Sequence, residues 1–203
     1  MMQPAGGIQA VVWDVDGVLV HPWRFRDALI RDHGIQPEVT LPFFRGPFVE
    51  CVLGRAELLE ILPHAAATWG WPGTARELLH LWLTVEDAPN EAVFALVDRV
   101  RRTVARSCVA SVQERHRADY LASEMGLADR FDDLFFSCHM GARKPEPAYY
   151  EVVEDRLGVP PSSLLLIDDS APNVDAAQAR GWQAELFTDA EALEARLTAR
   201  GLL

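Results

Sequence analysis

The sequence predicts an α/β protein in which a parallel sheet is covered by helices on both faces and interrupted by a helical insertion. The first apolar run, Ile8–Trp13, contains no alternating polar residues, which is typical of a strand buried on both faces. After Arg106, short apolar runs alternate with helical patterns, as in βαβ units. Between these two regions the apolar residues recur mostly at helical spacing.

The first strand is expected to end at Asp14, because Asp16-Gly17 favours a turn. Pro22 suits the first turn of a helix, and a helix is predicted over Trp23–His33.

A proline and two capping residues divide the helical stretch that follows. A helix is predicted over Arg55–Leu62, and Pro63 is expected to start a new turn or helix. Thr74 suits the N-cap of a helix over Ala75–Leu83, and Asn90 suits the N-cap of the next helix. That last helix carries apolar residues at helical spacing, namely Val93, Leu96, Val97 and Val100.

The rest of the sequence alternates strands with helices. Strands are predicted at 108–112, 134–136, 164–167 and 184–187, and helices at 113–125, 147–157, 173–180 and 190–200. We therefore expect an α/β core domain formed by residues 1–21 and 103–203, and a helical domain formed by residues 22–102.

The composition argues against a nucleic-acid or membrane partner. The formal net charge is -11, whereas phosphate backbones select clustered Lys and Arg. No run approaches the ~20 apolar residues of a membrane span, and residues 1–7 lack the basic start of a signal peptide. Cys51, Cys108 and Cys138 are odd in number and far apart, which is typical of reduced thiols. We therefore expect a cytoplasmic protein; the sequence does not indicate its oligomeric state.

Chemically active residues follow the predicted strands, at the edge where open parallel sheets bind ligands. Asp14 and Asp169 could share one divalent cation, and their hard oxygen atoms suit Mg²⁺. A carboxylate beside a metal can act as a nucleophile, and a second one two residues on, Asp16, can serve as general acid and base. Ser111 and Lys144 would complete a cradle for a transferring phosphoryl group.

Four segments, in order along the chain, resemble the motifs of the haloacid dehalogenase (HAD) superfamily, most of whose members are phosphatases. The matching segments are Val11–Val18, Val109–Ser111, Lys144-Pro145 and Leu165–Ser170. The resemblance extends from Ile8 to Phe187, and its first and fourth motifs are specific. It implies a Rossmann-like core and a mobile helical cap between the first and second motifs, which agrees with the predicted insertion.

The resemblance also implies roles for the polar residues of the first three motifs. Asp14 would be the nucleophile and a metal ligand. Asp16 would be the acid/base, with its backbone carbonyl also reaching the metal. Ser111 would hydrogen-bond the phosphoryl group, and Lys144 would hold the nucleophile and the phosphoryl charge in place.

In the fourth motif, Asp169 is expected to be the main downstream metal ligand, with Asp168 a ligand or a neighbour of the ligands. Asn173 falls where many relatives have another Asp, so we expect it to orient a metal-bound water or to cap its helix. Val112 departs from the family pattern, because relatives often have Asn there. Its presence removes a polar group near the substrate.

The leading functional hypothesis is a Mg²⁺-dependent phosphomonoester hydrolase that acts on a small phosphorylated metabolite through a phospho-aspartate. A phosphomutase of the same superfamily would use the same residues. A haloacid dehalogenase needs neither the metal nor Asp16, so the presence of Asp16 and Asp169 argues against it. A non-catalytic binding module would be expected to have lost the nucleophile or the metal ligands.

Other conspicuous residues have structural explanations. Trp69, Trp71 and Trp82 are expected to pack within the insertion rather than to contact substrate. The histidines show no ligand spacing. The arginines of the insertion are expected on solvated helix faces, with one or two of them near the site: Arg24, Arg26, Arg31, Arg45 and Arg55.

Overall fold

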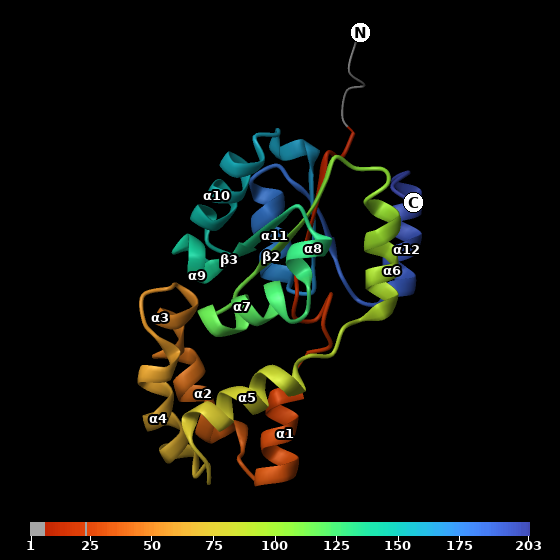
Figure 1. Ribbon diagram of the computed structural model, residues 1–203. Coiled ribbons are helices and arrows are strands. Elements are labelled where there is room, and N and C mark those ends of the chain that lie inside the picture. Colours follow the sequence, from red (N-terminus) through yellow and green to blue (C-terminus); the bar gives the residue numbers. More distant parts are fainter. Residues whose placement is uncertain (1–6, 23) are drawn as a thin grey trace.

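The computed structural model describes residues 7–22 and 24–203; residues 1–6, which carry most of the expectation about a signal peptide, and Trp23, the expected start of the first helix, lie outside the described residues. Its centre is a five-stranded parallel sheet with the order β3-β2-β1-β4-β5 (Figure 1). The strands are β1 (Ala10–Trp13), β2 (Arg106–Ser111), β3 (Asp133–Phe136), β4 (Leu164–Asp168) and β5 (Gln183–Leu186). The predicted Rossmann-like α/β class is confirmed.

The sheet is built around β1, whose residues are all apolar and fully buried. In the ladder, Trp13 lies opposite Val109 of β2 on one side and Ile167 of β4 on the other. One further bond, from the Asp14 N–H to the Ile167 carbonyl at 2.9 Å, extends the pairing past the strand end. The carboxyl ends of three neighbouring strands therefore meet at one edge of the sheet.

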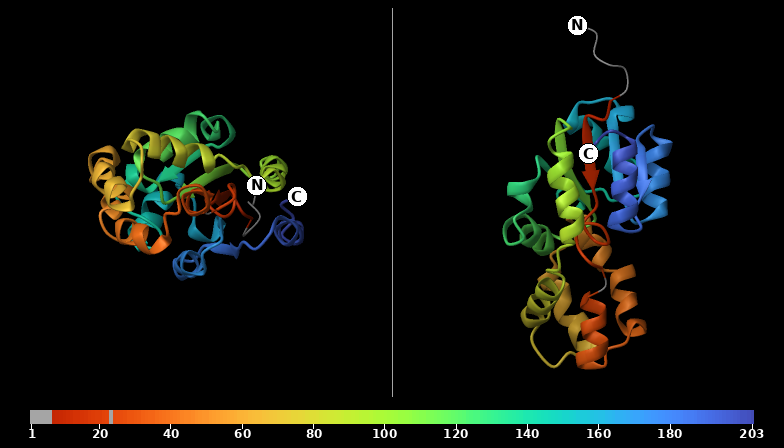
Figure 2. Two further views of the ribbon diagram at one scale, coloured as in Figure 1. Left: turned by 90° about the horizontal axis from the view of Figure 1, so that it is seen from below. Right: turned by 90° about the vertical axis from the view of Figure 1, so that its right-hand side faces the viewer.

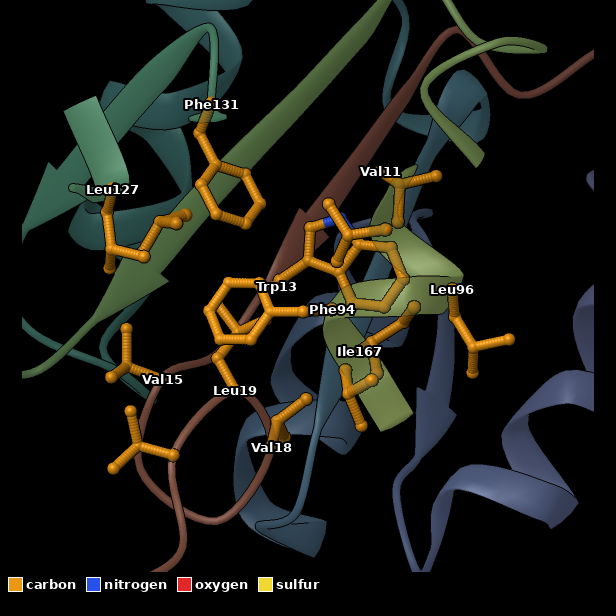
Figure 3. Close-up of a cluster of buried hydrophobic side chains, with 14 of the residues drawn as sticks. Val11, Trp13, Val15, Val18, Leu19, Phe94, Leu96, Leu127, Phe131 and Ile167 are labelled. Carbon is orange, nitrogen blue, oxygen red and sulfur yellow. The ribbon is translucent and has the colours of Figure 1, made fainter. Parts of the chain in front are cut away.

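Successive residues of β1 face opposite sides of the sheet and enter two different apolar clusters. Val11 and Trp13 pack with side chains of α6 (Glu91–Val100), α7 (Arg115–Ser123), α8 (Leu127–Arg130) and α12 (Ala190–Ala199). Figure 3 shows Phe94 of α6 beside Trp13 in this cluster. Ala10 and Val12 pack on the other face with α10 (Pro147–Leu157) and α11 (Ala171–Ala179).

The helices that follow β1 form a separate body beyond the carboxyl edge of the sheet (Figure 1 and the right-hand view of Figure 2). They are α1 (Arg24–His33), α2 (Pro37–Arg45), α3 (Phe48–Val52), α4 (Leu58–Trp69) and α5 (Ala75–Val85). Their buried residues form a third apolar cluster, which includes Leu62, Trp69 and Leu78. Among the helices of the described residues, none is both long and apolar enough to span a bilayer.

The position of α6 bears on where the helical domain ends. Asn90 caps this helix as predicted, because its side chain accepts a hydrogen bond from the N–H of Val93. The apolar face of α6 packs against the sheet rather than against α1–α5. We therefore propose that the helical domain ends before α6, about ten residues earlier than the limit at residue 102 expected from the sequence.

Several local boundaries differ from the predictions; the helix predicted to begin at Arg55, for example, begins at Leu58. Pro63 lies inside α4 instead of starting a new element, because burial of Leu62 and Ala66 in the insertion core outweighs the backbone hydrogen bond that proline cannot donate. The helix predicted to begin at residue 113 begins two residues later. Its N-cap is Glu114, whose side chain accepts hydrogen bonds from the first-turn N–H groups of His116 and Arg117.

The capping box of α5 yields a stability prediction. Thr74 accepts a hydrogen bond from the N–H of Glu77, whose side chain in turn accepts one from the N–H of Thr74. Thr74→Ala removes the first of these bonds, so we expect the free energy of unfolding to fall by about 1 kcal/mol in urea titrations. Thr68→Ala, an exposed threonine inside α4, is the control and should change it by less than about 0.5 kcal/mol. Equal losses in both variants would contradict the capping role.

Candidate active site

The centre of the site is a buried ion pair at the carboxyl edge of the sheet. Asp14 follows β1, and Asp168 ends β4 beside it. Lys144 reaches both from the loop after α9 (Ser137–Met140), with its Nζ 3.0 Å from Asp14 Oδ1 and 2.5 Å from Asp168 Oδ2. All three side chains are almost completely buried. The fold therefore brings together residues of three motifs, of which the first and last, Asp14 and Asp168, are 154 positions apart in the sequence. The order of the motifs predicts this convergence.

Asp168 is held by further donors besides Lys144. The Asn173 side-chain amide donates to both of its oxygens, at 3.0 and 3.1 Å, and the Ser170 N–H donates to Oδ1 at 2.9 Å. The N-cap of α11 is Ser170, so Asn173 does not cap its helix. Of the two expectations for Asn173, helix capping is therefore wrong. Orientation of a metal-bound water stays a prediction.

Asp16 and Ser111 are joined by a residue that the sequence analysis did not single out. The Gln113 side-chain amide donates to Asp16 Oδ2 at 2.6 Å and to Ser111 Oγ at 2.9 Å. Gln113 and Ser111 are buried, whereas 45% of the Asp16 side chain is exposed. The Asp16 carboxylate is therefore held in place and still open to a ligand.

Gly17 allows the first motif to approach the fourth. Its φ is +89°, a conformation that other residues rarely adopt. A Cβ atom at this position would lie 2.1 Å from Asp169 Oδ2. The absence of a side chain at Gly17 therefore leaves room for the carboxylate of Asp169.

Three carboxylates near Lys144 have the chemistry of a metal site. Oxygen atoms of Asp14, Asp168 and Asp169 lie within 4.8 Å of one another. Burial raises the pKa of Asp14 to about 8, with Lys144 opposing the shift and Asp168 adding to it. Burial, followed by the charge of Asp168, also raises the pKa of Asp169. One ammonium group does not neutralise three acids, so a small divalent cation with oxygen ligands fits this cluster.

Arg117 is a second cation that the sequence analysis did not identify. It is buried on α7, donates to the backbone carbonyl of Glu86 at 3.0 Å, and lies 3.8 Å from Asp16 Oδ1. Its Nε and Nη1 atoms have no hydrogen-bond partner within the part of the chain that the structure describes. Burial, reinforced by Asp16 and opposed by Arg117, raises the pKa of Glu86 to about 7. Sequence gives no signal for this pair, because residues 86 and 117 meet only through tertiary folding.

A pocket of about 450 Å³ connects these acids with the helical insertion. Asp16, Glu86 and Asp169 line one part of it, and Pro22 and side chains of α1, α2, α3 and α5 line the rest. Of the arginines expected on helix faces, Arg26 lines the pocket. Trp82 also lines it, although the sequence analysis favoured packing alone for this residue.

The raised pKa of Asp14 predicts how the stability of the metal-free protein depends on pH. The folded protein binds this proton more tightly than the unfolded chain, whose Asp titrates near 3.8. Asp14 therefore contributes a loss of stability as the pH rises from about 4 to about 8. Asp14→Asn should remove this contribution, so that in chelator the variant gains stability over the wild type as the pH rises through that range.

The measurement is urea unfolding of both proteins in chelator across that pH range. Asp175→Asn, which removes an exposed carboxylate of α11, is the matched control and should follow the wild type. The prediction would be contradicted if the free energies of unfolding of the Asp14→Asn variant and the wild type differed by the same amount at every pH.

Comparison with known proteins indicates the family to which the chain belongs. The profile of the haloacid dehalogenase-like hydrolase family matches residues 8–181. The fructose-1-phosphate phosphatase YqaB of Escherichia coli is 27% identical over 187 residues, which cover 86% of this chain and 93% of that protein. The drimenol cyclase drtB of Aspergillus calidoustus is 32% identical over 77 residues. That match covers 36% of this chain and only 15% of drtB, so the chain corresponds to a small part of the longer protein.

A similar fold is found in a HAD family enzyme of Bacteroides thetaiotaomicron, crystallised in complex with magnesium and inorganic phosphate. The TM-score is 0.74 and the identity 21%, with 92% of this chain and 99% of that chain covered. This likeness shows the fold alone. The profile match spans all the candidate site residues from Asp14 to Asn173, and on that basis the chain belongs to the haloacid dehalogenase-like hydrolase family.

Proposed function

We propose that this hydrolase is a Mg²⁺-dependent phosphomonoester phosphatase that forms a phospho-aspartate on Asp14. The observation that carries the proposal is the contact between Asp14 and Lys144, whose charged atoms lie 3.0 Å apart. Two residues after Asp14, the half-exposed carboxylate of Asp16 lines the pocket. Transfer through an acyl phosphate needs such a nucleophile and such an acid/base. The fructose-1-phosphate phosphatase activity of YqaB, and the magnesium and phosphate bound to the Bacteroides enzyme, support the same chemistry.

The reaction would proceed in two displacements at phosphorus. In the first, an Oδ atom of Asp14 forms a bond to phosphorus while the bond to the leaving oxygen breaks, and protonated Asp16 gives its proton to that oxygen. In the second, Asp16 takes a proton from a water molecule, whose oxygen attacks phosphorus as the bond to Asp14 breaks. The products are an alcohol and inorganic phosphate, and one water molecule is consumed.

The residues around Asp14 would prepare these steps. Lys144 keeps Asp14 oriented and offers positive charge to the phosphoryl oxygens. The Ser111 hydroxyl would hydrogen-bond the same group. Gln113 fixes the Asp16 carboxylate through the 2.6 Å hydrogen bond, so the acid/base does not have to be ordered when substrate binds.

For the metal, we propose Asp14 and Asp169 as the carboxylate ligands, together with the backbone carbonyl of Asp16. When bound, Mg²⁺ supplies positive charge that stabilises the transferring phosphoryl group. We assign Asp168 to a positioning role, because both of its oxygens already accept hydrogen bonds, from Lys144 and from neighbouring donors.

A small phosphorylated metabolite is the substrate that this site fits, and we propose the cytoplasm as its location. The net charge of -11 disfavours a polyanionic partner. The three cysteines are free and buried, and burial raises the pKa of each thiol, to about 11 for Cys51 and Cys138 and about 12 for Cys108. Such thiols suit a reducing compartment.

The first test is hydrolysis of p-nitrophenyl phosphate with Mg²⁺ and with chelator. We expect activity only with the metal, and a loss of about 10³-fold or more in kcat for Asp14→Asn, because this variant lacks the nucleophile. Asp175→Asn should keep the wild-type rate, since this exposed carboxylate lies outside the described site. Asp16→Asn should form the acyl phosphate but hydrolyse it slowly, so mass spectrometry of acid-quenched protein should detect a phosphoryl adduct.

Turnover in chelator, or by Asp14→Asn, would contradict the phospho-aspartate route. Transfer of the phosphoryl group to a hydroxyl of a sugar, instead of to water, would indicate a phosphomutase. If no phosphate ester were hydrolysed, a non-catalytic binding protein would be the better description.

A further inference from the structure

The pocket beside the acids has two chemically different parts. Asp16 and Asp169 line one end, next to the proposed nucleophile. The insertion lines the rest, mostly with apolar side chains: Phe25, Leu29, Pro37, Leu41, Phe44, Phe48 and Trp82. A phosphoryl group at the acids would therefore direct its leaving group toward the apolar wall. The volume, about 450 Å³, lies within the range of small-molecule sites.

Stacked aromatic rings form much of this wall. Phe25 and Trp82 stack with ring centroids 4.8 Å apart and an interplanar angle of 9°. Phe44 meets Trp82 edge-on at 5.5 Å, and Phe48 lies 5.4 Å from it. Packing against one another limits the movement of these rings. They form a preordered apolar surface that costs little entropy when a ligand binds.

The polar side chains of the insertion part of the pocket already make hydrogen bonds or ion pairs within the protein. The Trp82 indole N–H donates to Glu86 Oε2 at 3.1 Å. The Thr40 hydroxyl donates to the Pro37 carbonyl at 3.2 Å. The Arg26 guanidinium pairs with Asp27 at 3.0 Å. A sugar placed here would lose a hydrogen bond to water at each buried hydroxyl that finds no new partner, and this loss disfavours its binding.

Charge further narrows the ligand class. The acidic end already contains Asp16, Glu86 and Asp169, and the phosphoryl group would lie beside Lys144. The arginines near this part already face acids. Arg26 pairs with Asp27, and Arg117 lies 3.8 Å from Asp16. A second anionic group on the leaving part would compete with these acids for positive charge and be repelled by them. A neutral leaving group avoids this repulsion.

We propose that the substrate is the phosphomonoester of a neutral, apolar alcohol whose ring or hydrocarbon body packs against the wall formed by Phe25, Phe44, Phe48 and Trp82. This assignment rests on the proposed phosphatase function and specifies its substrate class. Leu41 is the best position for testing it. This residue lines the pocket from α2, and it is 39% exposed, so a polar replacement does not open a cavity in the core.

The experiment compares primary alkyl phosphates with similar leaving-group chemistry: 2-naphthylmethyl phosphate, glucose 6-phosphate and methyl phosphate, each with Mg²⁺. We expect kcat/KM for the naphthylmethyl ester to exceed that for the glucose ester by about 10-fold or more, since apolar contacts discriminate on this scale. Leu41→Asn should lower the ratio of naphthylmethyl to methyl kcat/KM by about 5- to 10-fold.

Val39→Asn is the matched control. Val39 lies on the same helix and is 41% exposed, but it lines a different hollow, on which the insertion residues Phe43 and Trp69 also border. This variant should leave the ratio unchanged. As a measurement that does not depend on turnover, 2-naphthalenemethanol should bind the wild type in calorimetry and bind Leu41→Asn more weakly.

The outcomes separate the two proposals. Faster hydrolysis of the glucose ester, without binding of the naphthyl alcohol, would overturn the substrate class and leave the phosphatase assignment intact. Equal ratios in the Leu41→Asn and Val39→Asn variants would also overturn it. Failure to hydrolyse any ester, p-nitrophenyl phosphate included, would overturn the phosphatase function and the substrate class with it.

Discussion

The ion pair between Lys144 and the acids of β1 and β4 is the interaction on which the site depends. It places one ammonium group against Asp14 and Asp168 at the ends of neighbouring strands, where water is almost completely excluded. Without that cation the acids would repel one another in a medium that screens charge poorly. With it, the site remains short of positive charge. That shortage favours a divalent cation.

The order of the strands makes this pairing possible. Because β1 is central and β2 and β4 are its neighbours, the residues after all three strands meet at one edge. Two amide side chains add hydrogen bonds that orient the acids: Asn173 donates to Asp168, and Gln113 donates to Asp16. Polar residues of this kind orient the acids without adding charge. The positions of the acids are therefore fixed without a further cation.

The helical insertion and the sheet are packed as separate bodies that meet through polar and backbone contacts. The insertion has its own apolar cluster, whereas α6 belongs to the cluster of the sheet. Across the junction, the His116 ring and the Glu57 carboxylate lie 2.5 Å apart, and the Ser137 hydroxyl donates to the Val52 carbonyl at 2.6 Å. The pocket lies where these bodies meet, so its chemistry is acidic on one side and aromatic on the other.

The sequence by itself was enough to predict the strands, most helices and the acids and lysine that the structure brings together at the carboxyl edge of the sheet. Periodicity and capping residues act locally, and α10 therefore occupies the predicted range, Pro147–Leu157. The same logic failed at Pro63, because a local helix breaker was outweighed by burial that only the folded insertion supplies.

Only the tertiary structure decided which side chains complete the site and what surrounds it. Gln113, Arg117 and Glu86 have no motif, since their partners lie elsewhere in the chain. Trp82 looked like a packing residue because sequence spacing does not distinguish a ring inside a core from one that borders a pocket. Local patterns specify strands, turns and caps, but a pocket is formed by distant segments. Its shape and polarity therefore depend on how those segments pack.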